Sequence, residues 1–193
     1  MLYLLRPAAS LVVLLTLLLG LAVPLAFTGA ANLVFPAQAG GSLVVREGQV
    51  VGSALLGQAF TADRYFHPRP SATTEPDAAG GSRAAPYNAA ASAASQLGPT
   101  SAALLEAVKE RAAALGATPV PADAATASAS GLDPHISPEN ALRQVARVAT
   151  ARGLDAAALR ALVARQVQGP ELGLLGEARV NVLRLNLALD ALR

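Results

Sequence analysis

Hydrophobic residues are concentrated at the start of the chain, where no charged side chain occurs between Pro7 and Val45. Within this stretch, the only polar side chains from Leu11 to Ala31 are two threonines. A bilayer hydrocarbon core about 30 Å thick needs about 20 apolar residues of helix to span it. A buried helix of a soluble protein would normally keep a polar face, which this stretch lacks. The pattern therefore predicts one transmembrane helix over residues 7–33.

The other segments are placed relative to this helix. We expect residues 1–6 to form a short N-terminal tail, residues 34–42 to form a linker, and residues 43–193 to form one domain. Arg6 lies on one side of the helix, whereas Arg46 on the other side is offset by Glu47. Basic residues flanking a membrane helix favour the cytoplasmic side. This small bias predicts a single-pass protein of the cell (inner) membrane, with a cytoplasmic N-terminus and an extracytoplasmic main domain.

A cleaved secretory signal is the competing interpretation of the same stretch. Ala37, Gln38 and Ala39 have the small-x-small pattern of a cleavage site. However, the apolar stretch exceeds the roughly 7–15 residues of a typical signal core, and the candidate site lies well beyond its end. We therefore favour a retained anchor.

Beyond the linker, short β-branched runs predict a small early sheet. Residues 43–45 and 50–52 flank a turn that contains glycine, which is typical of a β-hairpin. Pro68 and Pro70 prevent a helix around them. Residues 71–100 are rich in Ala, Ser, Gly and Pro and predict a long irregular loop.

Helix start and stop signals are confined to the second half of the chain. We expect three helices there: residues 102–115 after Ser101, residues 138–152 after Ser137, and residues 156–168 after Asp155. A second loop is expected over residues 117–131. Residues 180–190 fit both helical spacing and strand alternation, and their Leu and Ala content favours a helix. The predicted fold class is α+β, with several later helices behind the membrane helix and the small sheet.

Composition excludes several kinds of site. The chain has 193 residues with 15 basic and 13 acidic side chains, so it lacks the dense basic surface that binds nucleic acid. It has no cysteine, which excludes disulfides, thiolate zinc ligands and a cysteine nucleophile. Its two histidines, His67 and His135, are too few for a histidine-rich metal site. No P-loop and no G-x-S-x-G motif occurs. We therefore expect no metal and no cofactor of its own.

The clearest charge pattern lies on two of the expected helices, which carry five arginines: Arg143, Arg147, Arg152, Arg160 and Arg165. Arg143 and Arg147 are four residues apart and share one helix face. This pattern has two interpretations, a contact with an acidic partner or an anion, and a solvated helix face.

Four stretches carry motifs that are recognisable in order and spacing: Tyr65-Phe66-His67-Pro68-Arg69-Pro70-Ser71-Ala72, Tyr87 to Pro99, Thr126 to Pro138 with Gln144-Val145 after it, and Val180 to Asp190. Together with the N-terminal helix, they resemble the C subunit of the bacterial Kdp potassium-transporting P-type ATPase. The resemblance covers nearly the whole chain. It implies an accessory subunit that has no catalytic activity of its own.

The resemblance also implies partners and a role. The family complex contains a channel-like subunit that selects potassium, a P-type ATPase subunit and a small single-helix subunit, all within the lipid bilayer. ATP and potassium would be handled by the complex. The C subunit would be needed for assembly, and it is proposed to act as a catalytic chaperone that raises the ATP affinity of the ATPase subunit. A domain outside the membrane would not meet cytoplasmic ATP, so that effect would act at a distance.

Three sets of candidate residues follow. By analogy with signature loops of other ATPases, nucleotide contact is expected at Ser128, Ser130, Gly131 and Gln144. Partner contact is expected at Tyr65, His67, Arg69, Asp133 and His135. Close docking of membrane helices is expected at Gly20 and Ala26, because small residues let helix backbones approach. The alternatives are a free-standing membrane-anchored or secreted envelope binding protein, and an anchored enzyme, against which the lack of a nucleophile motif counts.

Overall fold

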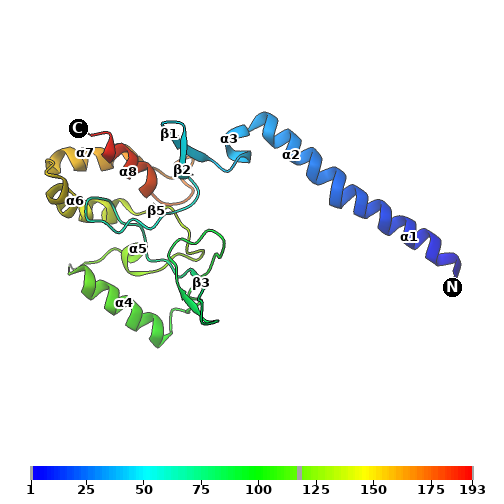
Figure 1. The fold of residues 1–193 in the computed structure, drawn as a ribbon, viewed down its shortest axis with the longest axis horizontal. Coiled ribbons are helices and arrows are strands. Elements are labelled where there is room, and N and C mark those ends of the chain that lie inside the picture. The colour runs from blue at the N-terminus through cyan, green and yellow to red at the C-terminus, as the bar shows by residue number, and fades with distance from the viewer. Residues whose placement is uncertain (1, 117–118, 193) are drawn as a thin grey trace. The chain divides into compact units, whose positions relative to one another are not determined.

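The computed structural model describes residues 2–116 and 119–192, and the chain divides into two compact units, Met1–Val51 and Gly52–Arg193 (Figure 1). The first unit holds a long apolar helix, and the second holds small sheets and several helices. The predicted α+β class is confirmed.

The apolar N-terminal stretch forms one uninterrupted helix. It consists of α1 (Leu2–Leu17), a π-helical segment η1 (Leu18–Ala22) and α2 (Val23–Val34). The helix starts at Leu2, earlier than the expected residues 7–33, and includes the residues just before Pro7. Tyr3–Val34 is long and apolar enough to cross a membrane, and none of its side chains is buried in the described chain.

The π-helical turn is explained by Pro24. A proline has no N–H, and its ring clashes with the carbonyl four residues earlier, which here belongs to Gly20. In η1 the N–H of Val23 instead reaches back five residues to the carbonyl of Leu18. Such a turn is one of the known ways in which a helix adjusts locally. The helix thus continues through the proline and keeps the length that a bilayer requires.

A short helix and a hairpin follow. Helix α3 (Pro36–Ala39) precedes β1 (Leu43–Arg46) and β2 (Gln49–Ser53), which pair in a two-stranded sheet. Between the strands, Glu47 and Gly48 have φ of 53° and 79°, as the tight hairpin turns of this kind require. The predicted early hairpin is confirmed.

The region expected to be an irregular loop contains a second hairpin. Strands β3 (Thr74–Pro76) and β4 (Ser82–Ala84) pair antiparallel, with Glu75 opposite Arg83. The side chains of this pair form an ion pair across the strands. These strands contain proline, charged residues and alanine instead of alternating β-branched residues, so their pattern does not predict strands. The prediction of a purely irregular loop over residues 71–100 was wrong here.

The later helices follow the predicted caps. Helix α4 (Ala102–Leu115) and α6 (Pro138–Arg152) have the expected bounds, and α7 (Ala156–Gln166) ends two residues early. The caps are Ser101, Ser137 and Asp155, whose side-chain oxygens accept N–H groups of the first turns over 3.4, 3.1 and 3.0 Å. A short α5 (Ala122–Ala125) interrupts the expected second loop, of which residues 117 and 118 lie outside the described part.

The ambiguous C-terminal segment is both strand and helix. Strand β7 (Arg179–Asn181) lies between β5 (His135–Ile136) and β6 (Val167–Gln168) in a three-stranded antiparallel sheet. Helix α8 (Val182–Asp190) follows directly, and the Asn181 side chain caps it by accepting the N–H of Arg184 over 3.1 Å. One residue therefore ends the strand and starts the helix.

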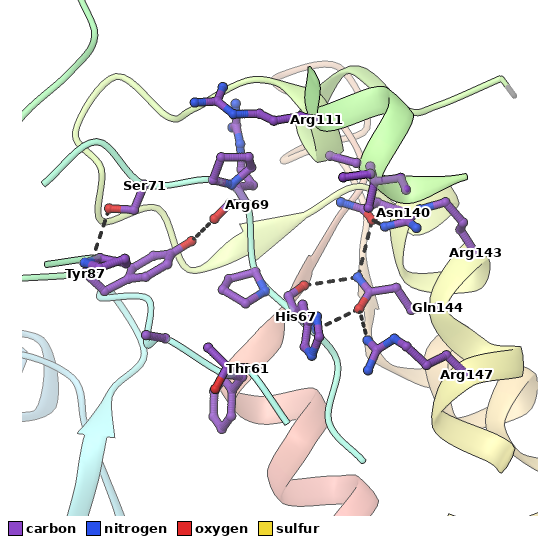
Figure 2. Close-up of a pocket in the computed structure, with 18 residues that line it drawn as sticks. Thr61, His67, Arg69, Ser71, Tyr87, Arg111, Asn140, Arg143, Gln144 and Arg147 are labelled. Carbon is purple, nitrogen blue, oxygen red and sulfur yellow. Dashed lines mark hydrogen bonds between the residues drawn. The ribbon is translucent and has the colours of Figure 1, made fainter. Parts of the chain in front are cut away.

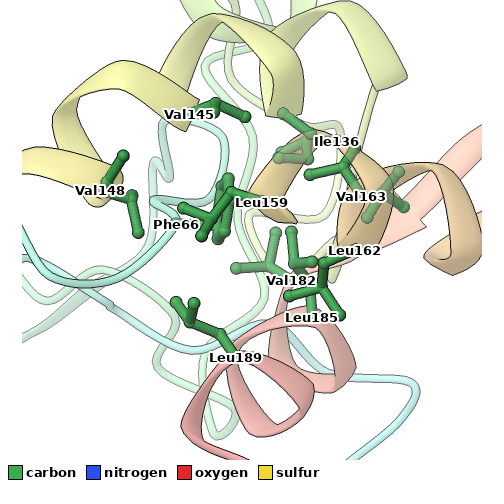
Figure 3. Packing of buried hydrophobic residues seen from close by; sticks show 13 residues of the cluster. Phe66, Ile136, Val145, Val148, Leu159, Leu162, Val163, Val182, Leu185 and Leu189 are labelled. Atoms are coloured by element: carbon green, nitrogen blue, oxygen red, sulfur yellow. The ribbon is translucent and has the colours of Figure 1, made fainter. Parts of the chain in front are cut away.

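The hydrophobic core of the second unit surrounds Phe66 (Figure 3). It is built from one face each of α6, α7 and α8 and from the three-stranded sheet, with these buried residues: Ile136, Ala141, Val145, Val148, Ala149, Leu159, Leu162, Val163, Val180, Val182, Leu185 and Leu189. Phe66 itself is fully buried, although its segment has no regular structure. Helix α4, by contrast, buries no residue.

Candidate functional site

Two side-chain amides hold the backbone of the extended segment that carries Phe66. Asn186 of α8 accepts the N–H of Phe66 over 2.9 Å and donates to its carbonyl over 3.0 Å. Gln144 of α6 does the same for His67, over 2.7 and 3.0 Å (Figure 2). We call Gln144 and Asn186 the amide clamp. Both are buried, so the clamp satisfies backbone groups that would otherwise lack partners in the core.

Two arginines of α6 hold the same segment. Arg147 donates to the carbonyls of Asp63 and Tyr65 over 2.7 and 3.0 Å. Arg152 donates to the carbonyl of Arg64 over 2.7 Å. These two side chains therefore position the chain's own backbone, a role that neither interpretation of the arginine pattern predicted.

Tyr65 lies in an aromatic and charged setting within the domain. Its ring centroid is 5.4 Å from that of Phe60, and the Arg152 guanidinium is 4.9 Å from it. Its hydroxyl donates to Asp190 over 3.3 Å, and Asp190 also forms a 2.6 Å ion pair with Arg152. Tyr65 is half-buried, so part of its surface remains available to a partner.

His67 lies beside the clamp, and its ring Nε2 is 3.1 Å from the carbonyl of Ala62. Burial and the nearby positive charge of Arg147 both disfavour the protonated ring and lower the pKa of His67.

Three of the expected partner-facing residues form one cluster. Arg69 forms a 2.9 Å ion pair with Asp133, whose other oxygen accepts the N–H of His135 over 3.0 Å. Burial alone would raise the pKa of Asp133, but the hydrogen bonds from His135 and the charge of Arg69 outweigh it and lower that pKa. Figure 2 shows Arg69 near Tyr87, whose hydroxyl donates to the Arg69 carbonyl over 2.8 Å.

The start of α6 is braced by Asp123 of α5. The Asp123 carboxylate accepts the N–H and the hydroxyl of Ser137, each over 2.8 Å, and the side-chain amide of Asn140 over 2.9 Å. Sequence reasoning identified the cap but missed Asp123, because the two residues are fourteen positions apart on separate elements.

The expected nucleotide residues are divided between two cavities. Ser128 and Ser130 line one of about 570 Å³, whereas Gln144 lines another of about 650 Å³. Gly131 is buried with φ of 68°, and a Cβ there would lie 2.7 Å from the Ala93 carbonyl oxygen. The oxygen and the nitrogen of the Gln144 side-chain amide both form hydrogen bonds with the backbone of His67.

The larger cavity is an open cleft beside the clamp (Figure 2). Apolar residues and arginines from α4 and α6 share its lining, including Phe60, Pro68, Tyr87, Leu115, Arg111 and Arg143. Arg111 donates to the Ala125 carbonyl over 3.0 Å, and Arg143 donates to Asn140 over 3.1 Å. A cleft that combines apolar side chains with arginines suits the docking of a partner protein. Within the described residues, no three His, Cys, Asp or Glu side chains gather to hold a metal ion.

Gly20 and Ala26 lie on the exposed N-terminal helix, in η1 and α2. At Gly20, no atom of the described chain beyond the helix's own nearby backbone and the two adjacent residues lies within 4 Å of the position that a Cβ would take. The surface around this glycine is therefore open to another helix.

These features describe a protein with a long apolar helix that could cross a membrane and a domain whose polar side chains mainly hold its own backbone. The sequence profile of the family described as "KdpC: K+-transporting ATPase, c chain" matches residues 5–191. The chain is 61% identical over 194 residues to the "Potassium-transporting ATPase KdpC subunit" of Methylobacterium nodulans, covering 97% of this chain and 96% of that protein. It is 57% identical over 190 residues to the KdpC subunit of Cereibacter sphaeroides, with 97% and 96% covered.

The chain therefore belongs to the KdpC family. The resemblance found in its motifs is confirmed. It is a non-catalytic subunit of the K+-transporting ATPase complex, and other Kdp subunits are its partners. The one candidate membrane span among the described residues fits a subunit of a membrane complex.

Proposed function

We propose that this chain assembles and regulates the potassium pump from the extracytoplasmic side. Its N-terminus lies in the cytoplasm, one helix crosses the bilayer, and the domain caps the channel-like subunit beside the potassium entrance. The division of the chain into an apolar helix with no buried side chain and a separate domain with its own core supports an anchored domain. The proposed side rests on Arg6 before the helix, because Arg46 after it is paired with Glu47.

The helix is proposed to be a docking element as well as an anchor. In lipid, helices associate through close packing of small residues, because lipid tails are as apolar as leucine. Gly20 and Ala26 supply such residues, and Gly20 lies within the π-helical turn that Pro24 causes. We propose that this segment packs against membrane helices of the ATPase complex, including that of the small single-helix subunit.

The domain is proposed to act on ATP affinity at a distance, as the catalytic-chaperone role requires. Coupling between two sites needs only a shared conformational equilibrium that both bias. Direct nucleotide contact at Gln144 would require its amide to release His67, because that amide already meets both backbone groups of the histidine. We therefore assign ATP and potassium to the partner subunits.

Co-purification tests this proposal. A tag at the C-terminus, pulled down in mild detergent from cells that express the whole complex, should recover the channel-like, ATPase and single-helix subunits together. Recovery of the tagged chain alone would contradict it and would favour a free-standing envelope binding protein. An unrelated single-pass membrane protein with the same tag controls for detergent carry-over.

A further inference from the structure

The connection between β6 and β7 is a ten-residue loop with an apolar tip. The strands pair Gln168 with Arg179, which leaves residues 169–178 between them. Leu172, Leu174 and Leu175 are 91%, 87% and 64% exposed. Among described residues beyond the N-terminal helix and Phe35, they are the most exposed large hydrophobic side chains. We call residues 169–178 the leucine loop.

The leucine loop is ordered by its own backbone. Glu171 and Leu175 exchange two hydrogen bonds, each of 2.9 Å, and Gly173 donates to the Pro170 carbonyl over 3.1 Å. Arg179 braces its base through a 3.2 Å ion pair with Glu171. The loop leads into β7, in which Arg179 is followed by the buried Val180. Its shape is therefore set before any partner binds, which lowers the ordering cost of docking.

Leu172 occupies a backbone conformation that leucine rarely adopts. Its φ is 55°, in the left-handed region that favours glycine and asparagine. The folded domain gains no buried contact from this side chain, because it lies in solvent. Several exposed apolar side chains that gather in this way mark an interaction site more often than isolated ones do.

The charges of the loop indicate which kind of partner it fits. It contains Glu171 and Glu177 but no basic and no aromatic residue. Segments that bind the membrane surface are rich in Lys, Arg and aromatic residues, and anionic lipid would repel the two glutamates. Glu171 is paired with Arg179, whereas Glu177 forms no ion pair within the described residues. The partner surface that would match this loop is therefore an apolar pocket on a protein, with a basic group at the rim of the pocket.

We propose that the leucine loop docks into such a pocket on another subunit of the same K+-transporting ATPase complex. This inference rests on the proposed function, since it names the surface through which the domain joins the complex. Leu172 and Leu174 enter the pocket, and Glu177 faces the basic group.

The test is a double substitution, Leu172→Ser with Leu174→Ser, in the full-length tagged chain expressed with the whole complex. The yield of partner subunits per tagged chain should fall by about ten-fold or more, as expected for the loss of central interface side chains. The matched control is Leu105→Ser with Leu142→Ser, two leucines that are 54% and 45% exposed elsewhere in the domain. The control should keep the wild-type yield. The urea midpoint of the leucine-loop variant should equal that of wild type, because its side chains support no core.

The outcomes separate the inference from the proposed function. If wild type recovers its partners and the leucine-loop variant recovers them equally well, the loop does not dock and the inference is overturned. If wild type itself recovers no partner, the proposed function fails.

A tryptophan reporter separates a protein pocket from the bilayer. The chain contains no tryptophan, so Leu174→Trp gives a single reporter in the chain alone. In vesicles of phosphatidylglycerol and phosphatidylethanolamine, its emission should stay at the wavelength of a water-exposed indole. A blue shift there would show insertion into lipid and would also overturn the inference. A further outcome is a dimer of the isolated chain that the double substitution converts to a monomer. That result would assign the loop to contact with a second copy of this chain and would also overturn the inference.

Discussion

The side-chain amide of Gln144 meets both backbone groups of His67, accepting its N–H over 2.7 Å and donating to its carbonyl over 3.0 Å. A neighbouring strand would normally supply these two bonds. Here a single helix residue supplies them, and Asn186 repeats the arrangement one residue earlier at Phe66. The segment that carries the most prominent motif of the sequence is thus fixed by side chains from two helices.

Replacing Gln144 with Ala should destabilise the domain by about 2–4 kcal/mol, because both backbone groups of His67 lose their partner. Urea unfolding monitored by circular dichroism measures the effect. The control Gln38→Ala removes an exposed glutamine and should change stability by less than about 0.5 kcal/mol. Unchanged stability combined with lost nucleotide binding would instead assign Gln144 to a nucleotide site.

Ser137→Ala should cost about 1–2 kcal/mol of unfolding free energy. The hydroxyl accepts the N–H of Asn140 over 3.1 Å and donates to Asp123 over 2.8 Å, so its loss removes both a cap and a partly buried hydrogen bond. The matched variant is Ser101→Ala, whose hydroxyl caps α4 over 3.4 Å on a helix that buries nothing. Its effect on the urea midpoint should be smaller. Equal effects would show that Asp123 adds nothing to the cap.

Acidification should weaken the domain through His67. Its pKa in the folded state is lowered, so both states are neutral above about pH 6.5 and stability is then at its full value. As the pH falls below that value, the unfolded chain takes up the proton first, and stability declines until the pH passes the folded-state pKa. His67→Gln should flatten the dependence of unfolding free energy on pH below about 6.5. Parallel curves for variant and wild type would refute this assignment.

Gly20→Leu combined with Ala26→Leu should loosen the complex while leaving the helix in the membrane. The chain itself leaves room for a side chain at Gly20, so the substitution disturbs only an external neighbour. Resistance to alkaline extraction confirms insertion, and co-purification of partner subunits reports docking. Normal recovery of all subunits would show that the helix merely anchors the chain.

The sequence predicted the elements whose signals are local. Ser101, Ser137 and Asp155 each start a helix where expected, because a cap is decided by the next three residues. The membrane helix was also predicted from a local signal, its continuous stretch of apolar residues. Its π-helical turn was not predicted.

The site could not be predicted, because its contacts join residues far apart in the chain. Gln144 lies 77 residues from His67, and Asn186 lies 120 from Phe66. Nothing in the local pattern distinguishes an amide that binds nucleotide from one that holds a backbone. The β3–β4 hairpin was missed for a related reason, since the cross-strand pair of Glu75 and Arg83 becomes visible only once the strands meet.

The location of the domain tests the central claim most directly, and the absence of cysteine makes the measurement clean. Gln49→Cys introduces one thiol on the exposed hairpin after the membrane helix. A membrane-impermeant maleimide should label this variant in intact cells whose outer membrane is permeable to the reagent. As a control, the same cysteine placed at Tyr3 should react only after the inner membrane is disrupted. Labelling of Gln49→Cys only after such disruption would place the domain in the cytoplasm and contradict an extracytoplasmic cap on the pump.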